Sequence, residues 1–378
     1  MVPTAKVLVD GTSGLEFDYS IPKNLHALVV VGSRVKVNLR NRPSTGTVVD
    51  LSSVTEGSGE ASYLKPISEL ITDKPILTPV LIELGRWISN YYVASMESVM
   101  RCLIPESVRG ERHDFKRLLF AKLIKVPSEE ELEGIRRRAK RQASILSELI
   151  ETGAPVQISR LGAGARGAAD GLVKKGFIEL TYEIVGRDPH ADEKFMPSQP
   201  LKLTDAQRHC LSCILEATNE PARAKPLLLH GVTGSGKTEV YLQAIAATIS
   251  SGKTALILVP EISLTPQTVA RFKRRFAEIQ QKVAVLHSHL SGGERFDEWH
   301  KIVEGNAKIV IGARSALFAP LQNLGLIVVD EEHEGSYKQD TAPRYHARDV
   351  AVVRAKIERC VVVLGSATPS LESIHNTR

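Results

Sequence analysis

A glycine-rich segment at residues 231–238 has the residue types and spacing of a phosphate-binding loop. It fits the pattern G-x-x-x-x-G-K-[ST]. Glycines let backbone N–H groups close around phosphate oxygens, and the start of a helix adds positive partial charge. Lys237 can bridge the β- and γ-phosphates of ATP, and the Thr238 hydroxyl can ligate Mg²⁺. The predicted nucleotide-binding residues are Gly231, Val232, Thr233, Gly234, Ser235, Gly236, Lys237 and Thr238.

Acidic side chains directly follow an apolar run at residues 326–329, in the order Asp330, Glu331, Glu332 and His333. A carboxylate at the carboxyl end of a buried strand lies where a bound nucleotide meets its metal ion. We expect Asp330 to hold Mg²⁺ through water and Glu331 to act as general base toward the attacking water. We expect His333 to link the nucleotide state to the rest of the molecule. A solvated acidic turn is the alternative, and the phosphate loop upstream argues against it.

Two further segments complete the predicted nucleotide site. Ser366, Ala367 and Thr368 follow another apolar run, where small hydroxyl side chains can hydrogen-bond the acidic residues and respond to the γ-phosphate. Gln207 precedes the phosphate loop and can read the adenine edge, although a single glutamine is more often an ordinary surface residue.

The elements that position these residues are short and apolar. Because the runs are continuous rather than alternating, they indicate strands buried on both faces, hence a parallel sheet covered by helices. We therefore predict an α/β P-loop (RecA-like) domain over residues 201–378. The predicted strands are 227–229, 256–259, 283–286, 309–311, 326–329 and 361–364.

The first 112 residues predict a small β-rich domain with a helical end. Strands are expected at 7–9, 28–31, 34–38 and 46–49, and the spacing of Leu81, Leu84 and Ile88 fits an amphipathic helix from Thr78.

Residues 113–186 have a different composition. A helix is expected over 129–150, a second from Ser159 and a strand over 177–182. That order is typical of a winged-helix domain, which either reads DNA or docks a protein. We interpret residues 187–200 as a linker.

Composition excludes several classes of protein. The chain has 378 residues, of which 43% are hydrophobic and 24% charged, so it is neither disordered nor collagen-like. Four cysteines exclude a disulfide scaffold and fit a reducing cytoplasm. We find no membrane span and no signal peptide. The net charge of +6 hints at a polyanionic partner, and two local clusters, 34–42 and 136–141, are either nucleic-acid faces or solvated surface.

The phosphate loop, the acidic box and Ser366-Ala367-Thr368, in this order, resemble the first motor lobe of a superfamily 2 helicase. The flanking segments 258–267, 312–320 and 330–349 resemble the primosomal replication-restart (PriA) helicase family in particular. The resemblance implies an ATP-dependent 3′-to-5′ DNA helicase that recognises stalled forks and reloads the replisome. It also implies a bacterial, cytoplasmic, nucleoid-associated protein. The partners implied are forked and single-stranded DNA, primosome proteins and single-strand-binding protein, with ATP and Mg²⁺ as cofactors.

The same resemblance implies DNA-binding residues in the N-terminal domain. Phe17 and Asp18 match the family's pocket for the 3′ end of the nascent strand, where a carboxylate can accept a hydrogen bond from a terminal hydroxyl. Lys65 matches a basic position that can meet a phosphate. The family commonly has Pro-Phe-Gly where this chain has Asn38-Leu39-Arg40, so a long cation replaces a glycine at the pocket.

A loop after the acidic box matches the family's aromatic-rich loop. Aromatic faces interleaved with cations suit a single strand, whereas a solvated loop would explain only the cations. Backbone contacts would give salt-sensitive binding without sequence preference. The predicted strand-binding residues are Arg314, Tyr337, Lys338, Arg344, Tyr345 and Arg348.

A motor of this type has a second lobe, and the family carries a zinc module after the first. We expect both to lie outside these 378 residues. Nothing resembling a second lobe follows Thr368, and Cys210 and Cys213 form a single C-x-x-C pair inside a predicted helix, which is weak evidence for zinc. Two other functions stay open. One is a fork-binding adaptor that does not hydrolyse ATP, and the other is a different superfamily 2 translocase, such as a branch-migration motor.

Overall fold

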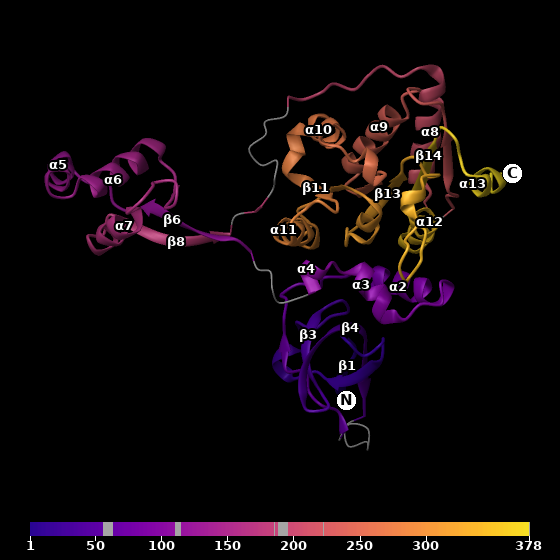
Figure 1. Cartoon of the computed structure of the whole chain (residues 1–378), viewed down its shortest axis with the longest axis horizontal. Helices are drawn as coiled ribbons and strands as arrows, with labels where there is room; N and C mark the ends of the chain where they lie inside the picture. Colours follow the sequence, from indigo (N-terminus) through magenta and orange to yellow (C-terminus); the bar gives the residue numbers. More distant parts are fainter. Residues whose placement is uncertain (56–62, 110–114, 185, 188–195, 222, 378) are drawn as a thin grey trace. The chain divides into compact units, whose positions relative to one another are not determined.

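The computed structural model describes residues 1–55, 63–109, 115–184, 186–187, 196–221 and 223–377. The chain forms two compact units (Figure 1). Unit 1 joins residues 1–112 with residues 192–378, and unit 2 comprises residues 113–191. No helix of the described residues is long and apolar enough to cross a membrane.

The C-terminal part of unit 1 is built on a six-stranded parallel sheet, as predicted. The strand order is β11-β12-β10-β13-β14-β9. Side chains of one strand enter two cores, because Leu256 and Leu258 pack on one face and Ala255 and Ile257 on the other. The strands are β9 (Leu227–His230), β10 (Thr254–Leu258), β11 (Val283–Leu286), β12 (Ile309–Gly312), β13 (Leu324–Val329) and β14 (Val361–Ser366).

Helices cover both faces of this sheet (Figure 1). One face carries α8 (Asp205–Asn219), α9 (Lys237–Ser250) and α10 (Pro266–Arg275). The other carries α11 (Gly292–Val303), η4 (Arg314–Phe318) and α12 (Ala347–Glu358). Shorter helical elements are η2 (Glu261–Ser263), η3 (Ala277–Lys282), η5 (Gly335–Tyr337) and α13 (Leu371–His375).

The N-terminal part of unit 1 contains a five-stranded antiparallel sheet in the order β2-β1-β4-β3-β5. Arg40 and Asn41 connect β3 to β4 with φ angles of 48° and 66°, a two-residue turn that matches the twist of a hairpin. The elements are β1 (Val2–Val9), β2 (Glu16–Ser20), η1 (Lys23–Leu25), β3 (Arg34–Leu39), β4 (Arg42–Val54) and β5 (Glu69–Leu70).

The strand predicted at residues 28–31 is wrong. The chain turns there, since the N–H groups of Leu28 and Val29 both donate to the carbonyl of Leu25. Val29 is buried in one hydrophobic core and Val31 packs, partly buried, against another, whereas Leu28 and Val30 are exposed. The turn ends at Gly32, where a Cβ atom would lie 2.0 Å from the Leu77 carbonyl oxygen. The conformation of this segment is therefore determined by the close approach of the Gly32 and Leu77 backbones rather than by the β-propensity of its valines.

Three helices of the N-terminal part pack on the C-terminal sheet domain. They are α2 (Pro79–Tyr91), α3 (Met96–Leu103) and α4 (Glu106–Arg109). The helix predicted from Thr78 is confirmed, with the Thr78 hydroxyl accepting from the N–H of Leu81. Leu84 and Leu103 share one hydrophobic core with Ile302, and the Trp299 indole N–H donates to the Ile76 carbonyl over 3.4 Å. Unit 1 is therefore one packed body.

Unit 2 combines three helices with a small antiparallel sheet in the order β7-β6-β8. The predicted helix 129–150 is two helices separated at Ala139, which has φ −149°. The helix expected from Ser159 starts at Ala165, after two glycines with positive φ, and strand β6 was not predicted. The winged-helix assignment stays a prediction. The elements are β6 (Arg117–Leu123), α5 (Glu129–Arg138), α6 (Lys140–Thr152), β7 (Val156–Gln157), α7 (Ala165–Lys174) and β8 (Ile178–Ile184).

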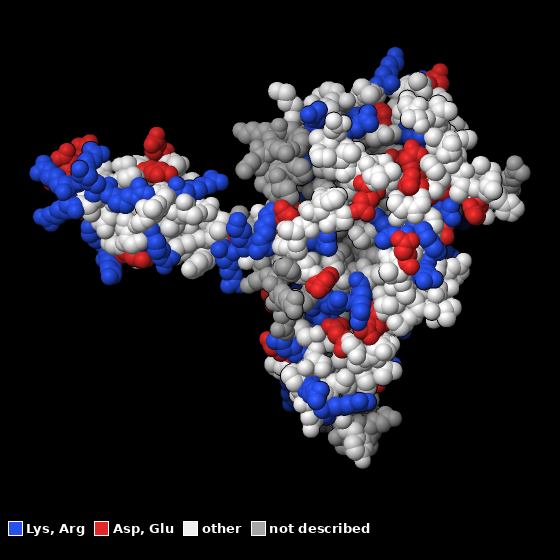
Figure 2. All heavy atoms as spheres, in the orientation of Figure 1, with Lys and Arg blue, Asp and Glu red and all other residues white. Residues whose placement is uncertain are grey.

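Charged side chains of both signs are interspersed on the face shown in Figure 2. The cluster 136–141 is exposed apart from Ala139. The cluster 34–42 is not a single solvated basic face. Arg34 is 1% exposed and pairs with Asp10 over 2.6 Å, while Lys36 pairs with Glu69 over 3.2 Å. Arg34 also donates to the Thr47 hydroxyl and the Arg109 carbonyl, each over 3.1 Å.

Replacing Arg34 with methionine should therefore lower stability rather than DNA affinity. Asp10, whose side chain is 34% exposed, would lose its cation, and the Thr47 hydroxyl and the Arg109 carbonyl would lose their donor, so we expect the free energy of unfolding to fall by about 1–3 kcal/mol in urea denaturation. Arg42→Met on the exposed start of β4 is the control and should change it by less than about 0.5 kcal/mol. Unchanged stability with weakened DNA binding in Arg34→Met would contradict a structural role.

Candidate functional site

The phosphate loop connects β9 to α9 at the carboxyl edge of the parallel sheet. Gly234 and Gly236 have φ angles of 81° and 82°, which side chains rarely adopt. The N–H of Gly231 donates to the Ser366 carbonyl on β14 over 3.1 Å. The Lys237 ammonium donates to the Gly231 carbonyl over 2.7 Å and lies 3.8 Å from a Glu331 carboxylate oxygen. The loop thus faces the acidic residues, as the sequence predicts.

Asp330 follows β13 and is held from two directions. The Tyr241 hydroxyl donates to its carboxylate over 3.3 Å, and the Tyr337 hydroxyl donates to its carbonyl over 2.7 Å. Burial, reinforced by the charge of Glu331, raises the pKa of the Asp330 carboxyl. A carboxylate whose charge is poorly stabilised by protein alone suits a site completed by a cation.

The donor atoms at this edge fit Mg²⁺, which prefers oxygen ligands and keeps several waters. Thr238 would supply a hydroxyl and Asp330 a carboxylate, with phosphate oxygens filling other positions. Among the described residues, no three His, Cys, Asp or Glu side chains form a metal-binding group.

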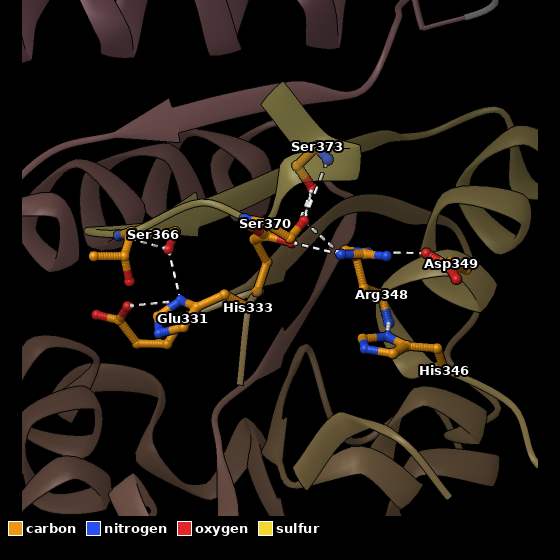
Figure 3. A network of polar contacts seen from close by, with 10 residues as sticks. Glu331, His333, His346, Arg348, Asp349, Ser366, Ser370 and Ser373 are labelled. Carbon is orange, nitrogen blue, oxygen red and sulfur yellow. Dashed lines mark hydrogen bonds and ion pairs between the residues drawn. The ribbon is translucent and has the colours of Figure 1, made fainter. Parts of the chain in front are cut away.

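Glu331, His333 and Ser366 form one polar cluster (Figure 3). The His333 Nδ1 lies 2.7 Å from the Ser366 hydroxyl oxygen and 3.7 Å from a Glu331 carboxylate oxygen. The Thr368 N–H donates to the same hydroxyl over 3.1 Å, and Ala367 lies between them in sequence. The residues predicted to couple the acidic box to the Ser366–Thr368 segment are brought together here.

Gln207 lies against the phosphate loop. Its side-chain oxygen accepts from the Thr204 N–H over 2.9 Å, and its amide nitrogen donates to the Ser235 carbonyl over 2.8 Å. Both ends of the amide are engaged within the protein, so its reading of adenine stays a prediction.

Glu332 is a buried residue for which the sequence suggested no role. It is 0% exposed and accepts from the Ser370 N–H over 2.7 Å, the Ser373 hydroxyl over 2.9 Å and Arg348 over 3.1 Å. These three partners are labelled in Figure 3. Burial alone would raise the pKa of Glu332, but these hydrogen bonds together lower it. Glu332 therefore stays ionised and joins the acidic box to α12 and α13. The one feature of the sequence that could have pointed to Glu332 was its position next to Glu331 in the acidic box.

The aromatic residues after the acidic box are turned inward. Tyr337 and Tyr345 are each 1% exposed, and the Tyr345 ring meets Phe318 edge-on at 5.3 Å. The structure does not show the exposed stacking faces that the sequence predicted, because both rings belong to the hydrophobic core. Arg348 likewise points to Glu332.

Two cations of this loop, unlike its two tyrosine rings, are accessible to a ligand. Lys338 and Arg344 are exposed. Arg314 donates to the carbonyls of Ser336, over 3.3 Å, and Lys338, over 2.5 Å, and so holds the loop.

The predicted 3′-end residues lie at one edge of the N-terminal sheet. Phe17 is half-buried and Asp18 is exposed on β2, which is an edge strand. The Ser20 N–H donates to the Lys65 carbonyl over 3.0 Å, and the Lys65 ammonium donates to Asn41 over 3.2 Å. Strand β2, Lys65 and the turn that contains Arg40 are therefore neighbours.

Family models match two parts of the chain. Residues 204–377 match the DEAD/DEAH box helicase model. Residues 6–105 match a model described as a 3′ DNA-binding domain. The two matches cover the nucleotide site and the β2 edge.

Similar proteins agree with both matches. The chain is 38% identical to the replication restart protein PriA of Bacillus subtilis, over 98% of this chain and 54% of that protein. It is 37% identical to the protein of that name from Haemophilus influenzae, over 96% and 48%. The chain thus spans about half the length of these relatives. A solved structure of RecG bound to a three-way DNA junction aligns with 47% of this chain and 22% of its own, at 27% identity and a TM-score of 0.34.

The Glu332–Arg348 pair gives a stability prediction. Arg348→Met should lower the free energy of unfolding by about 3–5 kcal/mol, because it leaves Glu332 charged, buried and without its cation. The double variant Glu332→Gln/Arg348→Met removes both charges and should recover part of that loss. Urea denaturation of the four proteins in the cycle measures the coupling, and additive effects would contradict it.

Proposed function

Because the chain belongs to the PriA family of replication restart proteins within helicase superfamily 2, we propose that it serves in an ATP-dependent 3′-to-5′ DNA helicase of replication restart. The proposed substrate is a stalled fork, recognised through the 3′ end of its nascent strand. The observation that carries the proposal is the convergence of Lys237, Asp330 and Ser366 at one sheet edge, in a chain that also has a 3′ DNA-binding domain.

The nucleotide step follows from the chain's own residues. Lys237, held 2.7 Å from the Gly231 carbonyl, moves to the phosphates and neutralises charge there. Bound ATP with Mg²⁺ supplies the phosphoryl group. Glu331 orients and deprotonates the attacking water. His333, which contacts both Glu331 and Ser366, couples the state of the nucleotide to the Ser366–Thr368 segment. Full stabilisation of the γ-phosphate needs a further cation, which we propose comes from a second lobe.

DNA contacts are proposed at two places in unit 1. Asp18 and Phe17 receive the terminal sugar and base, while Lys65 meets a phosphate. Lys338 and Arg344, with the region around Arg314, meet the backbone of a single strand without reading its sequence. Primosome proteins and single-strand-binding protein are the proposed partners on the fork.

The phosphate-loop lysine should be required for DNA-stimulated ATP hydrolysis. We expect Lys237→Ala to lower the stimulated rate by about 10²–10³-fold, as the loss of one preorganised donor does elsewhere. Lys356→Ala, an exposed lysine on α12, is the control and should match wild type. A colorimetric phosphate assay with and without forked DNA measures both. Equal background rates in wild type and Lys237→Ala would favour the adaptor without hydrolysis.

Asp18 should determine the preference for a free 3′ hydroxyl. We expect Asp18→Ala to lose about tenfold in that preference, because a charge-assisted hydrogen bond disappears. Asp50→Ala is a matched control, since Asp18 and Asp50 both face Lys6 across β1. Fluorescence anisotropy on forks with a 3′ hydroxyl or a 3′ phosphate measures the ratio. A wild-type protein with no preference would support a different translocase.

A further inference from the structure

A cavity of about 490 Å³ lies between α9 and α10, beneath the segment 198–201. It is separate from the nucleotide-contacting residues of the phosphate loop, because it is lined by later residues of α9, namely Glu239 and Leu242. Three arginines from α10 line the opposite wall, at positions 271, 274 and 275.

Arg275 is buried with unused donors. Its side chain is 7% exposed, and one terminal nitrogen pairs with Glu239 over 2.6 Å. The Nε and Nη1 atoms are buried and have no acceptor within the part of the chain that the structure describes. Leaving buried donors without an acceptor is unfavourable, so these two donors can bind an acceptor that enters the cavity.

Glu239 does not supply that acceptor. One carboxylate oxygen accepts from the Leu201 N–H and the Gln243 amide, over 3.1 and 2.8 Å, and the other accepts from Arg275. Both carboxylate oxygens of Glu239 are therefore already occupied by donors, and the cavity lining has three arginines against this one carboxyl group.

The remaining lining supplies short polar groups. Thr265 and Thr268 lie at the first turn of α10, where N–H dipoles add positive partial charge. Arg271 and Arg274 are exposed at the rim. Guanidinium forks at the rim and floor of one cavity match the tetrahedral oxygens of a phosphate.

From this arrangement we propose that the cavity between α9 and α10 is a phosphate-binding site, distinct from the phosphate loop. Its ligand is a phosphate group, either free or within a nucleic-acid backbone. Arg275 binds from the floor through Nε and Nη1, and Arg271 and Arg274 close over the ligand from the rim.

Calorimetric titration with inorganic phosphate tests the free ligand. The phosphate loop is first filled with Mg²⁺ and a non-hydrolysable ATP analogue, so that it does not contribute. We expect one phosphate to bind, about tenfold more weakly in Arg271→Gln/Arg274→Gln. Arg275→Lys keeps the ion pair with Glu239 but loses the free donors, and it should weaken binding similarly. Arg223→Gln, at an exposed arginine outside the cavity, should not.

A second arm tests a nucleic-acid source. Single-stranded DNA affinity is measured against salt for the same variants. If a backbone phosphate occupies the cavity, Arg271→Gln/Arg274→Gln lowers the affinity and reduces the slope of log K against log salt by about 0.7, the value for one phosphate on a single strand. Phosphate binding without a DNA effect assigns a free anion. If neither phosphate nor DNA binding differs from Arg223→Gln, the proposal is overturned.

Discussion

The hydrogen bond from Tyr241 to Asp330 ties together the three elements on which the nucleotide site depends. It joins α9, which starts at the phosphate loop, to the end of β13. The hydroxyl passes over Gly365 on β14, where an added Cβ atom would lie only 1.5 Å from it. A side chain at position 365 would therefore separate the carboxylate from the loop. The absence of a side chain at Gly365 on β14 therefore lets α9 and β13 contribute to the same site.

Two adjacent glutamates serve opposite purposes because the backbone turns between them. Glu331 has a φ of 45°, a left-handed conformation that costs energy for a residue with a side chain. The turn points Glu331 toward Lys237 and His333 and sends Glu332 into the buried network with Arg348. The strained residue thus lies where one carboxylate must face the nucleotide while its neighbour anchors two helices.

The parallel sheet and the grouping of polar residues at its edge were predictable. Strands buried on both faces have continuous apolar sequences, and the polar residues directly follow these strands. The failures have a common cause. Arg34 looked like part of a basic surface, yet Asp10, its partner, lies 24 positions away. Tyr337 and Tyr345 looked like stacking faces, but only the fold reveals that they fill a core shared with α2 and α3. A sequence pattern gives the chemical type of a side chain, whereas its burial and its partners depend on residues that are distant in the sequence.

The loop after the acidic box is hydrogen-bonded to both the C-terminal and the N-terminal part of unit 1. The two parts are therefore joined through this loop. On the nucleotide side, Tyr337 donates to the Asp330 carbonyl. On the N-terminal side, Gln339 donates to the Cys102 thiol over 3.1 Å, and the His346 N–H donates to the Tyr92 hydroxyl over 3.2 Å.

These hydrogen bonds, and the hydrophobic core that Tyr337 and Tyr345 share with α2 and α3, join the two parts of unit 1. The N-terminal β-rich part and the parallel-sheet part therefore form one compact unit. The loop that contacts Asp330 through Tyr337 thus also contacts α3 through Gln339 and the end of α2 through His346.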